Sequence, residues 1–233
     1  MKKIVTLGPV SGDLDTIKTL SNFTKTFRLN GSHSTISWHK KTIKNVRKIC
    51  PNAFILMDIP GIKPRTANET SISISKNQTI TFGNLEGKCN HLNISLTKPL
   101  PQGSGKSSYF SVNDGQFLFE MTERSKEFIS GVSRSDFVLM PKKGLNLPHS
   151  IYDEHQQLEV YKDFIKKISE LEIDGLGLSF VQTGDLVDQV RKYAGDLVLI
   201  SKIENTAGLQ NCIEIINKSD AIMIDRGDLA AEI

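Results

Sequence analysis

Cysteine and long apolar runs are both scarce in this sequence. Of its 233 residues only three are cysteine, and they are far apart and form no CxxC pair. This pattern argues against a disulfide framework or a zinc site and fits a reducing compartment. The longest apolar runs span a handful of residues, far fewer than the roughly 20 needed to cross a bilayer. We therefore expect a cytoplasmic protein with no membrane partner.

A strong excess of one charge is also lacking. The net charge is +3, from 29 basic and 26 acidic residues. This is too weak to argue for nucleic acid, and mild positivity fits small anionic molecules equally well. The composition, 38% apolar and 24% charged, is that of an ordinary globular protein with room for one large or two modest domains.

One glycine-rich stretch, "PQGSGKSS" at 101–108, looks like a phosphate-binding loop. The P-loop pattern needs a glycine five residues before Gly105, where this chain has Leu100, and it needs a helix to follow. The stretch lies instead between two predicted strands. We interpret it as a turn and look elsewhere for phosphate chemistry.

Strand and helix patterns alternate at the two ends of the chain. The expected strands are 3–8, 26–30, 53–59, 174–180, 197–203 and 221–225. Apolar residues at helical spacing predict helices around 14–20, 36–49, 153–170, 184–194 (capped by Thr183) and 207–217. These six βα-type units predict an α/β fold, either closed as a barrel or left as an open sheet. A closed barrel needs eight strands, which exceeds the number found here.

The middle of the chain has a different texture. Short period-two segments follow one another at 70–75, 78–83, 91–96, 108–112, 116–121, 127–133 and 136–140. This pattern is typical of a small antiparallel β domain. It covers roughly residues 64–142, inserted after the third strand.

Polar residues gather where the predicted parallel strands end. They are Arg28, Asn30, Ser32 and His33 after the second strand, Asp58, Lys63 and Arg65 after the third, Lys202 and Glu204 after the fifth, and Asp225, Arg226 and Asp228 after the sixth. In α/β barrels the chemistry lies at this rim. Each residue alone could be an ordinary solvated loop charge, but the set together indicates a site. Two carboxylates suit Mg²⁺, and fixed cations suit a phosphoryl group.

At these residues the sequence resembles pyruvate kinase. The segments that carry the resemblance are "RLNGSHS" (28–34), "DIPGIKPRT" (58–66), "NDGQF" (113–117), "KKGLNLP" (142–148), "SKIEN" (201–205) and "DRGDL" (225–229). They occur in the family's order, and the resemblance covers essentially the whole chain. It implies an incomplete TIM (β/α)8-type barrel of about six βα units, residues 1–63 and 143–233. It also implies an inserted small antiparallel β-barrel lid domain after strand 3, residues 64–142.

The resemblance further implies phosphoryl transfer from phosphoenolpyruvate to ADP, the glycolytic step that gives pyruvate and ATP, with Mg²⁺ as cofactor. Lys202 and Arg28 would be catalytic and, with Gly227 and Asp228, would bind the substrate. The implied nucleotide contacts are Arg65, His33, Lys142 and Lys143, and the implied Mg²⁺ ligands are Glu204 and Asp228. The implied monovalent-cation pocket consists of Asn30, Ser32, Asp58 and Ile59. Because family members with Lys at position 63 tend not to need K⁺, we hypothesise that Lys63 replaces K⁺ here.

The chain also departs from the family pattern. Asp225 replaces an alanine, and we expect its carboxylate to repel the substrate carboxylate if it faces the site. Ala230 replaces a glycine and could crowd the turn at the metal. The last two barrel strands and the C-terminal domain of the family have no counterpart, so we expect the sixth strand to be an open edge. Self-association or a second chain could complete the barrel.

Three functions fit these observations. The first is a pyruvate kinase, with activity reduced by the missing strands. The second is a non-catalytic remnant that still binds Mg²⁺ or nucleotide. The third is another phosphoenolpyruvate or pyruvate barrel enzyme, such as a lyase, against which the β insert and the lysine pair at 142–143 argue.

Overall fold

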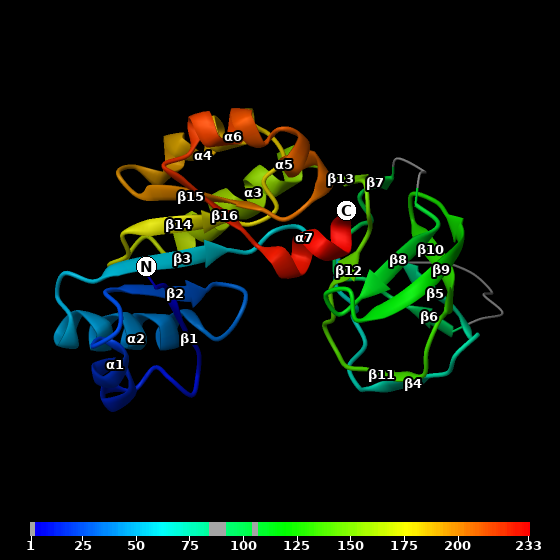
Figure 1. The fold of residues 1–233 in the computed structure, drawn as a ribbon, viewed down its shortest axis with the longest axis horizontal. Coiled ribbons are helices and arrows are strands. Elements are labelled where there is room, and N and C mark those ends of the chain that lie inside the picture. The colour runs from blue at the N-terminus through cyan, green and yellow to red at the C-terminus, as the bar shows by residue number, and fades with distance from the viewer. Residues whose placement is uncertain (1–2, 84–91, 104–106) are drawn as a thin grey trace. The chain divides into compact units, whose positions relative to one another are not determined.

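The computed structural model describes residues 3–83, 92–103 and 107–233 (Figure 1). Cys89, the first residue of the predicted strand 91–96 and the centre of the "PQGSGKSS" stretch lie outside these residues. The chain divides into two compact units. The α/β unit comprises Met1–Gly61, His155–Lys202 and Cys212–Met223, and the β unit comprises Ile62–Glu154, Ile203–Asn211 and Ile224–Ile233.

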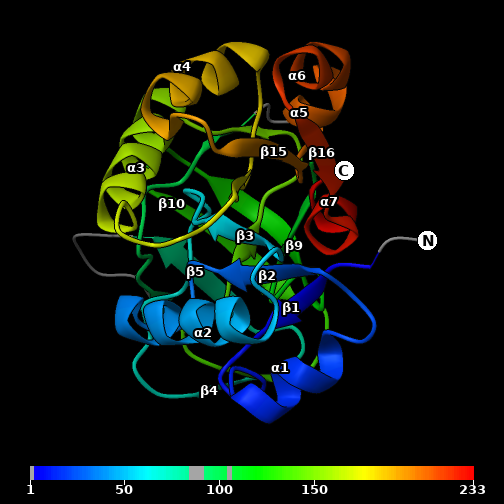
Figure 2. The same ribbon diagram turned by 90° about the vertical axis from the view of Figure 1, so that its left-hand side faces the viewer.

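A six-stranded sheet organises the α/β unit. Its order is β1 (Val5–Leu7), β2 (Thr26–Asn30), β3 (Phe54–Ile59), β14 (Gly175–Leu178), β15 (Val198–Ile203) and β16 (Ala221–Ile224). The pairs from β1 through β15 are parallel. Figure 2 shows the sheet curling, with helices around its outer side. This curled parallel sheet is consistent with an incomplete barrel, and all six predicted strands are confirmed to within a few residues.

Helices cover the sheet of the α/β unit. They are α1 (Leu14–Leu20), α2 (Ile36–Ile49), α3 (Glu154–Lys167), α4 (Gly184–Ala194) and α6 (Cys212–Lys218). Thr35 caps α2 and Thr183 caps α4 by accepting a backbone N–H three residues on, as preferred N-cap residues do. The predicted cap at Thr183 is therefore confirmed.

The predicted single helix 207–217 is wrong, because the segment forms two helices. The first is α5 (Thr206–Gln210), and α6 begins at Cys212. Asn205 caps the start of α5 with its side chain, and Asn211 ends it by donating its N–H to the carbonyl of Ala207 at 3.0 Å. Asparagine favours such helix ends because its short amide competes for backbone hydrogen bonds.

Fully buried apolar side chains fill the space between the sheet and the helices of the α/β unit. They include Phe27, Leu29, Ile55, Tyr161, Leu176, Val187, Val190 and Leu199. Strand β3 is buried along almost its whole length, as expected for a parallel strand covered on both faces. This core fixes the strand ends that carry the candidate site residues.

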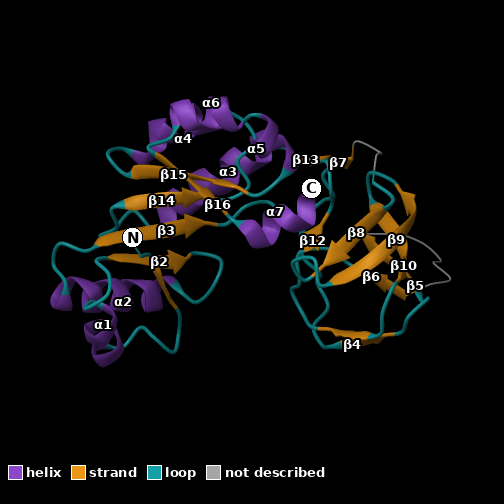
Figure 3. Cartoon of the chain, in the orientation of Figure 1, coloured by secondary structure: helices purple, strands orange, loops and turns teal. Residues whose placement is uncertain are grey.

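Strands are the main regular elements of the β unit (Figure 3). One six-stranded sheet has the order β12 (Leu145–Asn146), β8 (Tyr109–Val112), β9 (Phe117–Arg124), β10 (Phe128–Ser133), β5 (Thr79–Gly83) and β6 (Leu92–Ile94). Two further pairs are β11 (Phe137–Leu139) with β4 (Ile72–Ile74), and β13 (Ser150–Ile151) with β7 (Gln102–Gly103). The seven predicted strands all occur. The expectation of a purely antiparallel unit is wrong in one place, because β5 and β6 pair in parallel.

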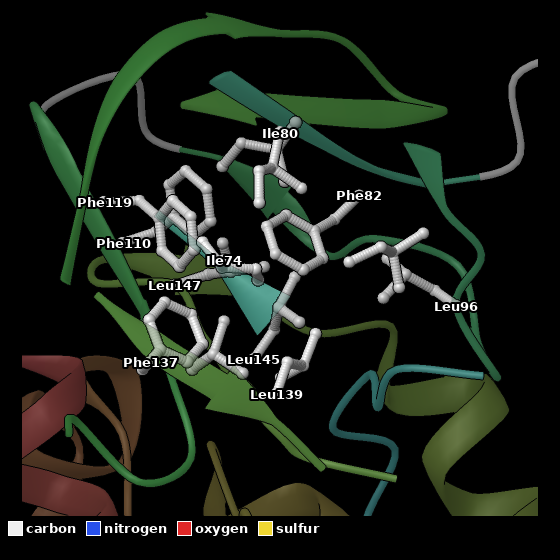
Figure 4. Close-up of a cluster of buried hydrophobic side chains, with 13 residues drawn as sticks. Ile74, Ile80, Phe82, Leu96, Phe110, Phe119, Phe137, Leu139, Leu145 and Leu147 are labelled. Carbon is white, nitrogen blue, oxygen red and sulfur yellow. The ribbon is translucent and has the colours of Figure 1, made fainter. Parts of the chain in front are cut away.

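The β unit has its own hydrophobic core. Figure 4 shows its aromatic and aliphatic side chains converging. Phe82 lies edge-on to both Phe110 and Phe119, which stack on each other with centroids 5.0 Å apart. Such pairs add to the stabilisation from burial alone. The unit also contains helix α7 (Arg226–Glu232), which the sequence pattern did not predict.

None of the helices in the described part of the chain combines the length and the hydropathy that a membrane-spanning helix requires. Cys50 and Cys212 are free thiols.

Candidate active site

Asp58 is the centre of a charged cluster in the α/β unit. Its Oδ2 accepts hydrogen bonds from Arg28 Nε at 2.9 Å and Arg28 Nη2 at 2.5 Å, and Lys202 Nζ lies 3.3 Å from the same oxygen. The three side chains come from β2, from its neighbour β3, and from β15, which β14 separates from β3 in the sheet. Both Asp58 and Lys202 are buried. One buried carboxylate thus holds two cations at the ends of these strands.

The other oxygen of Asp58, Oδ1, is buried and has no hydrogen-bond partner in the part of the chain that the structure describes. Gly177 leaves room beside it, since a Cβ there would lie 2.4 Å from Oδ1. An orphaned buried carboxylate oxygen fits a cation ligand, because burial without a partner is costly. This fits the predicted monovalent-cation role of Asp58.

The other predicted residues of this rim lie on or just after the same strands. Asn30 ends β2, and its Oδ1 accepts the backbone N–H of Ser32 at 2.9 Å. Ile59 ends β3 and is fully buried. His33 is exposed, and its carbonyl oxygen lies 2.9 Å from His39 Nε2.

Three carboxylates meet in the β unit. Ligand atoms of Glu204, Asp225 and Asp228 all lie within 4.8 Å of one another. Glu204 directly follows β15, Asp225 is the N-cap of α7, and Asp228 lies in its first turn. Asp225 makes no side-chain capping bond to the helix, so its carboxylate is not held by the helix N-terminus. The structure therefore brings together the two predicted metal ligands and adds a third acid.

Lys63 lies at the edge of this acidic cluster. Its Nζ is 2.5 Å from Asp228 Oδ1 and 3.2 Å from Asp114 Oδ1, and its side chain is only 6% exposed. Its stem packs over Gly144, where a Cβ would lie 2.8 Å from Lys63 Cε. Asp114 belongs to a turn in which Asn113, Asp114 and Gly115 all have positive φ. The buried ammonium group therefore links this turn to α7.

The predicted nucleotide-binding cations of the β unit are close in the fold. Arg65 Nη1 donates to the carbonyl of Lys142 at 3.2 Å, and the backbone of Lys143 pairs with Thr66. Burial, and then the charge of Arg65, lower the pKa of nearby Lys98. Lys98 thus lies near a like charge, and the sequence analysis missed it because no motif includes it.

The donor set of the β unit fits a divalent cation. Mg²⁺ prefers carboxylate oxygens, and several carboxylates at this separation repel one another unless a cation lies among them. Glu204 is almost fully buried, which makes uncompensated negative charge costly. The ammonium group of Lys63 offsets part of this charge through its contact with Asp228.

The sequence did not predict that two acids, Asp225 and Asp114, would join this cluster. Asp225 was counted among the polar residues at the strand ends, but it was expected to repel the substrate and was not predicted as a metal ligand. Asp114 belongs to the quoted motif "NDGQF", but nothing in the sequence linked it to Lys63, which is 51 positions away. The predicted meeting of Lys202 with Glu204 and Asp228 around one hollow stays a prediction.

The fold and these clusters define an α/β protein with a curled parallel sheet and charged groups at its strand ends. The family model described as pyruvate kinase, barrel domain, matches residues 1–233. The chain belongs to the pyruvate kinase family.

Similar proteins agree with this assignment. The chain is 30% identical to the pyruvate kinase of Thermococcus litoralis over 99% of its own length and 51% of that protein. It is 32% identical to the cytosolic isozyme of pyruvate kinase from Nicotiana tabacum over 100% of its own length and 49% of that protein. A pyruvate kinase from Thermotoga maritima is 28% identical, with 52% of its length covered. The chain spans about half the length of the curated relatives it matches.

Proposed function

We propose that this chain carries the phosphoryl-transfer site of a pyruvate kinase, which transfers a phosphoryl group from phosphoenolpyruvate to ADP and gives pyruvate and ATP. The observation that carries the proposal is the acidic cluster of Glu204, Asp225 and Asp228 in a chain matched by the family model over its whole length. The relatives' names support the reaction, and the cytosolic isozyme among them supports a cytoplasmic location.

In this proposal the cations of the α/β unit act on the phosphoryl group. Lys202 and Arg28 stabilise the negative charge of the group in flight, since charge on its oxygens is spread and fixed cations lower its energy. Asp58 holds both cations in place, which it does here through one oxygen. Arg65, Lys142, Lys143 and His33 contact the nucleotide.

Glu204 and Asp228 would hold the Mg²⁺, and the backbone of Gly227 and Asp228 would receive the substrate carboxylate. When bound, the metal supplies charge neutralisation for the phosphoryl oxygens. Asp225 adds a negative charge beside this position. We therefore expect weaker binding of the substrate carboxylate than in a chain with alanine there.

Asn30, Ser32, Asp58 and Ile59 would form the monovalent-cation pocket, with Lys63 as a substitute for K⁺. We expect any activity to be K⁺-independent. A several-fold rise in rate when K⁺ replaces Na⁺ would contradict this expectation.

We also propose that residues 64–142 form the lid domain and that residues 1–63 with 143–233 form the catalytic domain. A separate hydrophobic core supports an inserted domain, although this core also includes Leu145 and Leu147, which lie beyond residue 142. The end position of β16 in the sheet order supports association with another copy or a second chain, which a size measurement in solution tests.

A coupled assay of pyruvate formation from phosphoenolpyruvate and ADP, run with and without Mg²⁺, tests the proposed reaction. We expect Mg²⁺-dependent turnover that the exchange Asp228→Asn abolishes. The exposed residue Asp185 gives a matched control, Asp185→Asn, which we expect to keep the full rate. No turnover from folded protein would contradict the proposal.

A second candidate is a non-catalytic protein that binds Mg²⁺ or nucleotide. The observation that favours it is Asp225, because an added carboxylate strengthens attraction for a cation while it repels an anionic substrate. Metal binding without turnover is the expected result in that case.

A further inference from the structure

Glu232 is a buried acid that the proposed reaction does not use. It ends helix α7, and only 1% of its surface is exposed. Its Oε1 accepts two hydrogen bonds, from Asn146 Nδ2 at 3.0 Å and from the backbone N–H of Leu147 at 3.3 Å. Asn146 belongs to β12, so the side chain of Glu232 ties α7 to the main sheet of the β unit.

The backbone of the same residue makes a second connection. The carbonyl oxygen of Glu232 accepts the hydroxyl of Thr206 at 2.7 Å and the N–H of His149 at 3.4 Å. Thr206 begins α5 and lies two residues after Glu204. One residue therefore links α7 both to the sheet and to the segment that carries Glu204.

Helix α7 has only seven residues, so its two ends move together. Asp228 lies one turn before Glu232 and thus on the same side of the helix. Fixing Glu232 consequently limits where the carboxylate of Asp228 can lie.

We propose that Glu232 is a positioning residue, which holds α7 so that the carboxylate of Asp228 stays within the reach of Glu204 that a shared divalent cation requires. The inference rests on the proposed metal role of Glu204 and Asp228.

The charged and titratable groups around Glu232 agree with this role. Burial raises its pKa to about 7, while the positive charge of Lys63 and the two hydrogen bonds act in the opposite direction. The negative charge of Asp228 makes a small contribution to the same rise. Burial and then the charge of Glu232 also raise the pKa of Tyr152, which lies near Arg124. Burying a carboxyl group costs folding free energy. A helix that ended on the surface would avoid this cost.

Titration with Mn²⁺, followed by the electron paramagnetic resonance signal of the free ion, tests the proposal on the full chain. The variants are Glu232→Ala, which removes the acceptor oxygen, and Glu232→Gln, which keeps one. We expect Glu232→Ala to weaken Mn²⁺ binding roughly tenfold and Glu232→Gln to restore most of the loss. The exposed acid Glu123 of the same unit gives the control Glu123→Gln, with unchanged affinity.

Hydrogen exchange without metal gives a second measurement. We expect the amides of 226–232 to exchange faster in Glu232→Ala than in the unaltered chain, while those of β2 and β3 stay protected. If Glu232→Ala does not fold, Glu232→Asp takes its place, because it keeps the charge but shortens the side chain. We expect weaker Mn²⁺ binding with little change in melting temperature.

Equal Mn²⁺ affinity in a folded Glu232→Ala or Glu232→Asp chain and in the unaltered chain would overturn the inference alone. Failure of the proposed metal role has a different signature. In that case the unaltered chain would not bind Mn²⁺, or Asp228→Asn would bind it equally well. Either result would overturn the role of Asp228 and this inference with it.

Discussion

In the α/β unit one carboxylate, that of Asp58, is shared by two cations, whereas in the β unit one ammonium group, that of Lys63, neighbours several acids. Cations dominate the contacts of Asp58, and carboxylates dominate those of Lys63. Asp58, Lys63 and Lys202 are buried, where opposite charges attract strongly. The two clusters therefore suit opposite ligands. The two cations beside Asp58 favour an anion, and the acids beside Lys63 favour a cation.

The largest effect should come from removing Lys202, the buried cation of the cluster in the α/β unit. We expect Lys202→Met to lower the rate of pyruvate formation by about 10²- to 10³-fold, because a fixed charge aimed at developing negative charge is lost. The coupled assay measures this. The exposed lysine of α3 gives the control, Lys166→Met, and an equal loss in both variants would contradict the assignment.

Removing the shared carboxylate should mainly affect stability. In Asp58→Asn the cations Arg28 and Lys202 lose their common partner, and a broken buried pair costs about 3 kcal/mol of the free energy of unfolding. Urea denaturation measures the change. A loss below about 1 kcal/mol would show that solvent replaces the carboxylate.

The buried acid of the β unit should make stability depend on pH. Glu232 binds its proton more tightly in the folded chain, with a pKa of about 7, than at its ordinary value of 4.5. Its contribution is therefore fully present below pH 4.5 and is lost as the pH rises through about 7. Over this window we expect the free energy of unfolding of the unaltered chain to fall by roughly 2–3 kcal/mol. The variant Glu232→Gln should not show this fall. Urea denaturation at a series of pH values checks this, and parallel curves for the two chains would contradict it.

Removing one carboxylate from the acidic cluster of the β unit should weaken cation binding. We expect Asp225→Ala to lower Mn²⁺ affinity about three- to tenfold, since ligand charge sets affinity at such sites. Paramagnetic titration measures it. Unchanged affinity would mean that Asp225 does not contribute to the cluster's attraction.

The smallest effect should come from an ion pair outside both clusters. Lys218 and Asp188 are 2.6 Å apart, but each is nearly half exposed. Exposed pairs contribute little, so Asp188→Asn should change the free energy of unfolding by less than about 0.5 kcal/mol. A loss as large as that of Asp58→Asn would remove the contrast between buried and exposed pairs.

Most of the α/β unit could be predicted from its sequence, because its elements are long and strongly periodic. Strand β2 and helix α2 begin and end where the pattern places them. The elements that were missed include the two-residue strand β12 and helix α7. Such segments are held by tertiary contacts rather than by their own periodicity.

The candidate site was predictable only in its parts. Strand ends indicated Asp58, Lys202, Glu204 and Asp228, because side chains at the ends of parallel strands meet at one rim. The contact of Lys63 with Asp228 joins residues 165 positions apart, and no local pattern encodes it. The resemblance named Glu204 and Asp228, and the fold shows that a carboxylate oxygen of Asp225 lies within 4.8 Å of theirs.

The β unit is assembled from segments that are widely separated along the chain. Its strands lie within Ile62–Glu154, but Glu204, Asp225 and Asp228 reach it from Ile203–Asn211 and Ile224–Ile233. During synthesis a ribosome adds roughly 5–20 residues each second, so the strands emerge seconds before α7. The surface of the nascent sheet that contacts α7 therefore stays uncovered during this interval. A chaperone would bind the chain at this stage of synthesis.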